Sequence, residues 1–196
     1  MDINSLIGTL LSSDSVSGVS KATKSNNADV QSVLNAALPL LLKGAKAQSE
    51  DKNTSESFAK ALLSHGKDDT SNLSSFLSKV DLEDGSKIIG HLLGNDEGSV
   101  KKIAKSSGVS TKETSNILSA AAPLLMSLLG QESASKKSNN SAALEIAGAL
   151  LKNVDVGDLL GDLLGGGDTK KKKSSSRKKD NDTAELIGDI LGSLLK

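Results

Sequence analysis

The sequence predicts an all-α protein, and three observations lead to this prediction. Apolar residues recur at the three- and four-residue spacing of a helix face, and no segment alternates with the two-residue period of a strand. The two prolines, Pro39 and Pro123, lie 84 residues apart (123 − 39) in similar Leu-rich segments. A Leu-Ile-Gly or Ile-Ile-Gly segment begins at Leu6, Ile88 and Leu186. This repetition predicts a multihelical bundle built from two diverged helical repeats, plus a C-terminal helix on a flexible basic linker.

The second proline segment, Ser110–Gly130, has the clearest helical pattern. Its first residue and Glu113 have the spacing of a capping box, and its final glycine is a suitable stop. Pro123 removes a backbone hydrogen bond and costs roughly 3 kcal/mol inside a helix, so we expect a kink or a break there. The earlier copy, Asn26–Gly44, also starts with a good capping residue. Because the apolar faces of both segments are too wide to face water, we expect the two helices to pack in one core.

The remaining helices are expected to be shorter, and each is a run with apolar residues at helical spacing. A polar loop is expected at residues 48–56, and the polar residues 81–85 are expected to stop the preceding helix. The shorter helices are predicted at residues 3–11, 16–24, 58–65, 73–80, 87–93, 100–106 and 142–153.

The domain organisation follows from the repeat and from a change in composition. We expect a helical body at residues 1–164, with repeat 1 at about 3–80 and repeat 2 at about 84–164. A low-complexity basic linker at 165–181 then leads to an amphipathic helix at 182–196. This last helix has one apolar stripe, which is a candidate interaction surface formed by Leu186, Ile187, Ile190, Leu191, Leu194 and Leu195.

Composition excludes several functions. The chain has no cysteine, so it has no disulfide, thiol nucleophile or thiolate metal site. Its formal net charge is zero, which gives no global attraction to nucleic acid or membrane. No apolar run approaches the ~20 residues of a spanning helix and no secretory signal opens the chain, so we expect a cytoplasmic protein without a membrane span.

Enzyme chemistry has no sequence support. The only histidines, His65 and His91, have no recognisable carboxylate cluster or metal-binding motif around them, and His91 is expected to be a partly buried helix residue. No nucleophile-elbow or phosphate-loop motif occurs. We therefore expect a non-enzymatic protein with no catalytic residues, no metal and no cofactor.

The segment from Ile88 to Gly130 resembles the bacterial YidB-like family, a domain of unknown function. Its similar features are a Gly/Leu helix, a Ser-Gly-Val turn, and a Leu-x-x-x-Ala-Pro-Leu-Leu-Met core at Leu118–Met126. The resemblance covers about residues 6–130 and implies an all-helical fold with no established activity. The first copy departs from the pattern because it lacks the Ser-Gly-Val turn.

Ser99–Leu118 also has the spacing of a helix-turn-helix, which makes DNA binding an alternative function. Its second helix would offer Lys112 and Asn116 to a groove, but Glu113 would repel phosphate. We favour an ordinary helical corner in the core. A second candidate anion contact is the basic run at 170–179, which contains Lys170, Lys171, Lys172, Lys173, Arg177, Lys178 and Lys179. Such runs are usually solvated linkers.

The function predicted from the sequence is protein–protein interaction or self-association through Leu/Gly helix faces, with a homo-oligomer as one form. Peripheral membrane association through the Gly/Leu tail is a second alternative. The tail lacks aromatic anchors and Asp189 would oppose an acidic surface, so protein is the favoured partner.

Overall fold

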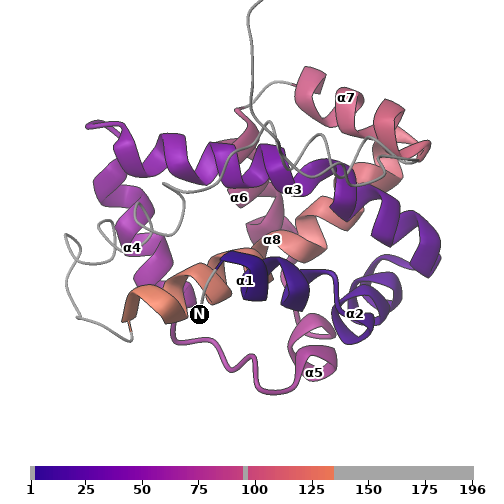
Figure 1. Cartoon of the computed structure of the whole chain (residues 1–196), viewed down its shortest axis with the longest axis horizontal. Helices are drawn as coiled ribbons and strands as arrows, with labels where there is room; N and C mark the ends of the chain where they lie inside the picture. The colour runs from indigo at the N-terminus through magenta and orange to yellow at the C-terminus, as the bar shows by residue number, and fades with distance from the viewer. Residues whose placement is uncertain (1–2, 95–96, 135–196) are drawn as a thin grey trace, which may run out of the picture. The chain divides into compact units, whose positions relative to one another are not determined.

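The computed structural model describes residues 3–94 and 97–134. This part of the chain is all helical, without a strand, as predicted (Figure 1). Its helices are α1 (Ile3–Leu10), α2 (Ser13–Thr23), α3 (Asn27–Glu50), α4 (Ser55–His65), α5 (Leu73–Leu77), α6 (Leu82–Leu93), α7 (Glu97–Ser107) and α8 (Thr111–Ala134).

The repeat is visible in the helix boundaries themselves. A shift of 84 residues (123 − 39) carries α2 onto α7 and α3 onto α8, end for end. α4 and α5 follow the first set of three helices and have no counterpart in the second set within the described residues. The fold of this region is thus two α-helical triplets, α1–α3 and α6–α8, joined by α4 and α5.

The turn before each long helix has the same backbone conformation in both repeats. Lys24 has φ of 59° and Gly108, its counterpart 84 residues later, has φ of 74°. The next residue in each case donates to a carbonyl five residues back: Ser25 N to Ser20 O and Val109 N to Ala104 O, both at 3.2 Å. The first repeat therefore keeps the turn although it lacks the glycine, and Lys24 adopts a conformation that costs an L-residue about 1–2 kcal/mol.

The caps of the two long helices are also equivalent. Asn26 Oδ1 accepts from Asp29 N at 2.8 Å, and Ser110 Oγ accepts from Glu113 N at 3.3 Å. Each side chain satisfies one of the free N–H groups at its helix start. The predicted caps are confirmed.

Of the two outcomes expected at Pro123, a break into two helices does not occur, because α8 runs continuously through this proline, as α3 does through Pro39. In α8, Pro123 cannot donate to the carbonyl of Ser119. Gly85 of α6 packs against this carbonyl so closely that a Cβ at Gly85 would overlap its oxygen. Gly130 is not a stop either, since α8 continues to Ala134 and Gly130 packs on the carbonyl of Leu62.

Two further boundaries differ from the prediction because polar residues start or extend helices. Asp81 Oδ1 accepts from Glu83 N at 2.8 Å, so Asp81 caps α6 and residues 82–85 form its first turn. They do not stop α5, which already ends at Leu77. α3 extends to Glu50, so the loop between α3 and α4 covers only residues 51–54.

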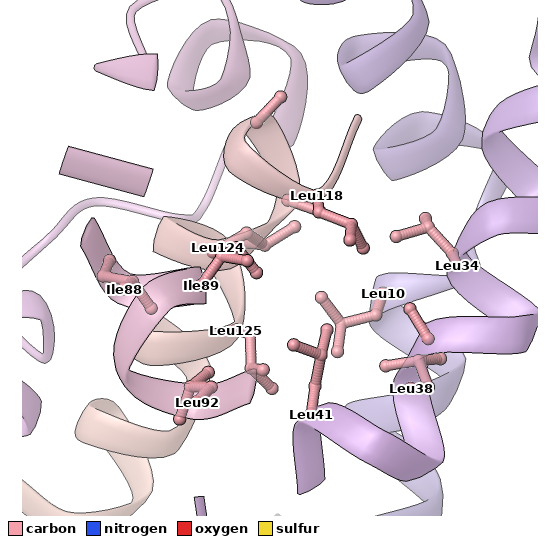
Figure 2. Packing of buried hydrophobic residues seen from close by; sticks show 14 of the residues in the cluster. Leu10, Leu34, Leu38, Leu41, Ile88, Ile89, Leu92, Leu118, Leu124 and Leu125 are labelled. Atoms are coloured by element: carbon pink, nitrogen blue, oxygen red, sulfur yellow. The ribbon is translucent and has the colours of Figure 1, made fainter. Parts of the chain in front are cut away.

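Both long helices contribute to one core, as predicted (Figure 2). Leu34, Leu38 and Leu41 of α3 face Leu118 and Leu125 of α8, and all five are at most 3% exposed. Each long helix also packs on the other repeat: α3 on α6 and α7, and α8 on α1 and α2. This exchange makes the two repeats one packing unit. The core contains aliphatic side chains and Phe58, with Phe76 at its edge.

Candidate functional site at the His65 corner

The main cluster of titratable side chains surrounds a surface pocket of about 410 Å³. We call it the His65 corner. The end of α4, the loop to α5, α5 with the residues that follow it, the start of α6 and the middle of α8 enclose it. Its titratable lining is His65, Lys79, Asp68, Asp69, Asp81 and Asp84, its other polar residues are Ser64 and Ser75, and its apolar lining is Phe76, Val80 and Pro123.

His65 lies between two carboxylates. Its Nδ1 is 3.1 Å from Asp68 Oδ2 and its Nε2 is 3.6 Å from Asp84 Oδ2. Through these two contacts the imidazole links the end of α4 to the start of α6. The side chain is only 18% exposed, so the contacts are partly shielded from water. The prediction that no carboxylate surrounds this histidine is wrong. The spacing from His65 to Asp68 could have indicated a local contact, whereas Asp84 arrives only through the packing of α6.

Asp68 is anchored to α8 as well. Ser127 Oγ lies 2.7 Å from Asp68 Oδ2 and 2.8 Å from the carbonyl of Pro123, so its single hydrogen is shared between two acceptors. Gln131 Nε2 donates to the backbone carbonyl of Asp68 at 2.7 Å and to Thr70 Oγ1 at 3.0 Å. These contacts hold the loop after α4 on the last turns of α8.

The electrostatics of the corner are dominated by anions. Four carboxylates line the pocket with one lysine. Hydrogen bonds from the Ser71 hydroxyl and then from its backbone N–H lower the pKa of Asp69, which keeps this exposed carboxylate charged. The Ser127 hydroxyl is fully buried and contacts a carboxylate instead of the imidazole, so it is not arranged as an activated nucleophile.

No group of three or more His, Asp or Glu side chains in the described ranges is arranged to hold a metal ion. The four carboxylates beside Phe76 and an aliphatic wall can attract a cation.

His91 is exposed on α6, which corrects the expectation of partial burial. Its backbone carbonyl accepts from Gln48 Nε2 at 2.8 Å, which ties the end of α3 to α6. The ring borders a second hollow of about 140 Å³, which we call the α4–α6 groove. The groove is lined by Gln48, Ser57, Phe58, Ala61, Ile88, His91, Leu92 and Met126.

The helix-turn-helix look-alike consists of α7, the Gly108 turn and α8. Lys112 and Asn116 are exposed at the start of α8. Thr114, which lies between them, is fully buried, and about one turn further Ala120 is fully buried and Ser119 is 6% exposed. The geometry is that of a helical corner whose second helix enters the core.

Both sets of candidate contact residues in the tail lie outside the described residues. These are the apolar stripe from Leu186 to Leu195 and the basic run from Lys170 to Lys179. Within the described ranges, no helix is both long enough and apolar enough to cross a bilayer.

Comparison with known proteins gives one match. Searches of the curated proteins and of the solved structures find no match. The model of a family described as "Bacterial protein of unknown function (DUF937)" matches residues 5–132, which is more than half of the chain. YidB is a member of this family, so the resemblance seen in the sequence is confirmed. The matched range runs from α1 into the last turn of α8, and the chain belongs to the DUF937 family of bacterial proteins of unknown function.

Proposed function

We propose that this protein is a non-enzymatic helical interaction module that binds a basic, partly apolar segment of a protein partner at the His65 corner. The observation that supports this proposal is the composition of the pocket. Asp68, Asp69, Asp81 and Asp84 line it with a single lysine, and Phe76 and Val80 form its apolar wall.

A lysine or arginine side chain matches this lining in two ways. Its charge is attracted by the carboxylates, and its aliphatic stem can lie along the apolar wall and the ring of Phe76. Leu82, which is 38% exposed, directly follows Asp81 and is the large apolar side chain with the greatest exposure in the described ranges. A partner with alternating basic and apolar residues would bury this side chain at the rim of the pocket.

Binding is favoured over catalysis because the buried hydroxyl at the corner does not contact the imidazole. The carboxylates of Asp68 and Asp84 lie beside His65, and Asp81 caps α6. The Ser127 hydroxyl is buried. A hydroxyl nucleophile would need to contact a base such as the imidazole, and Ser127 Oγ contacts Asp68 instead.

The test uses two designed helical peptides, one of Leu and Lys and the other of Leu and Glu, titrated into the isotopically labelled chain. We expect saturable amide shifts at Asp69, Phe76 and Lys79 with the Lys peptide only. Asp69→Lys should weaken this binding roughly fivefold to tenfold, since it reverses an exposed charge at the pocket. Glu50→Lys reverses an exposed charge at the end of α3 and should leave the affinity unchanged. Equal shifts with both peptides, or equal losses in both variants, would contradict the proposal.

The alternative functions can be separated from this one by direct assays. DNA binding through α7 and α8 predicts a salt-dependent gel shift that is lost when Lys112 and Asn116 are both replaced by alanine. Membrane association predicts flotation with acidic liposomes. Self-association through the stripe from Leu186 to Leu195 predicts a concentration-dependent mass that falls after removal of residues 165–196. We propose the stripe as a second protein contact, and a monomeric full-length chain would exclude self-association.

A further inference from the structure

The α4–α6 groove is an apolar hollow without an occupant among the described helices. Phe58 and Ala61 of α4, Ile88 and Leu92 of α6 and Met126 of α8 form its base. Its volume of about 140 Å³ corresponds to roughly five water molecules at ~30 Å³ each. Its polar neighbours, Gln48, Ser57 and His91, lie on the outside, so water on the apolar base has few hydrogen-bond partners. An aliphatic side chain fits this base better than water does.

The chain carries a suitable segment a short distance after α8. Residues 135–141 are mainly polar, and the following Ala142–Leu151 reads AALEIAGALL. Ala143, Ala147 and Leu150 recur at helical spacing with Ile146 beside them, whereas Glu145 lies on the other side of the helical pattern.

The distance from α8 back to the groove is within reach of the intervening chain. Met126 lies eight residues before the end of α8 at Ala134, which is about 12 Å along a helix axis. The seven residues 135–141 can span up to about 23–25 Å when extended. The segment can therefore reverse direction and return to the groove within the same molecule.

We propose that Ala142–Leu151 packs as a helix over the α4–α6 groove of its own chain and inserts aliphatic side chains into it. This surface is separate from the His65 corner, so the inference goes beyond the proposed function. It predicts that the family domain needs this segment, which follows the matched residues 5–132, to complete its apolar packing.

The absence of cysteine from the chain allows a direct test by disulfide pairing in the full-length protein. Ala61→Cys should be combined in turn with Ala147→Cys, Leu150→Cys and Glu145→Cys. We expect rapid oxidation to an intramolecular disulfide at Ala147 or Leu150, and at least about tenfold slower oxidation at Glu145, because a disulfide needs Cβ atoms about 3.5–4.5 Å apart. An Asn116→Cys partner on the exposed start of α8 serves as the distant control.

The outcomes separate the proposal from its competitors. Equal oxidation rates at Ala147, Leu150 and Glu145 would show that the segment is not docked, and a disulfide-linked dimer would show that a second copy covers the groove. Either result overturns the proposal.

A second measurement does not depend on engineered cysteines. Ile146→Asp with Leu150→Asp should raise amide exchange in α4 and α6 about tenfold or more, since two aliphatic contacts are lost, and leave α2 unchanged. Glu145→Lys should change neither. Unaltered exchange in α4 and α6 of the double variant would also reject the docked segment.

Discussion

α3 and α8 are the equivalent long helices of the two repeats, but they differ in how deeply they are buried. Both have 24 residues, an N-cap side chain and an internal proline. α8 is buried on every side from Ile117 to Gly130, whereas α3 exposes positions such as Lys43, whose counterpart in α8 is the buried Ser127. The difference arises because α4 and α6 pack on α8 and cover the side that the rest of the bundle leaves open. Two similar amphipathic patterns can therefore become one central helix and one covering helix.

The largest expected effect compares equivalent leucines of these helices. Leu124 of α8 is 1% exposed, and its counterpart Leu40 of α3 is only partly buried. Leu124→Asp should lower the free energy of unfolding by about 3–5 kcal/mol, because it leaves an unpaired charge in the core. Leu40→Asp should cost clearly less, since its carboxylate can reach water. Chemical denaturation of both variants measures the difference, and equal costs would refute the distinction between the two helices.

The contact that brings α6 onto α8 gives the next prediction. Gly85→Ala should destabilise the protein by about 1–3 kcal/mol, because its Cβ would overlap the Ser119 carbonyl and the two helices must separate. Gly8→Ala in α1 is the matched control. No atom lies within 4 Å of the added Cβ there, so this change should stabilise by up to about 1 kcal/mol. Thermal unfolding of the two variants should shift in opposite directions.

The His65 corner gives a third comparison, between the two histidines. His65→Ala should cost about 1–3 kcal/mol, since it leaves Asp68 and Asp84 without their shared partner beside α8. His91→Ala removes an exposed ring and should change the stability by no more than about 0.5 kcal/mol. Equal melting temperatures for the two variants would show that the His65 contacts do not stabilise the corner.

The smallest expected effect concerns the turns before the two long helices. Lys24→Gly should stabilise the protein by up to about 1 kcal/mol, because glycine relieves the left-handed strain at φ 59°. Gly108→Lys should destabilise by a similar amount at φ 74°. The denaturant midpoint of each variant tests both changes, provided that the m-value equals that of the unaltered protein. A loss of stability in Lys24→Gly would mean that the lysine side chain has a compensating contact.

Much of this fold was predictable from local sequence. Helical spacing predicted the location of every described helix, although several observed helix ends differ from the predicted ends by a few residues. The N-caps at Asn26 and Ser110 and the equivalence of the two proline segments also followed from residue types and their separations. These features depend on interactions within a few residues or on repetition of a segment. They can therefore be predicted without knowing which helices pack together.

The candidate site was not predictable in the same way. Asp69 and Asp81 resemble ordinary turn and capping residues, and only the packing of α6 on α8 brings Asp84 to His65. Pro123 shows the same limit, because a local rule allows either a kink or a break there, and the structure has a continuous helix.

The sequence by itself determined the all-α class, the repeat and the family. Only the tertiary structure decided that α8 is the central long helix, that the long helices continue through their prolines, and which carboxylates contact His65. The physical reason is that helix periodicity and capping act over three or four residues, whereas burial and charge pairing depend on which helices pack together.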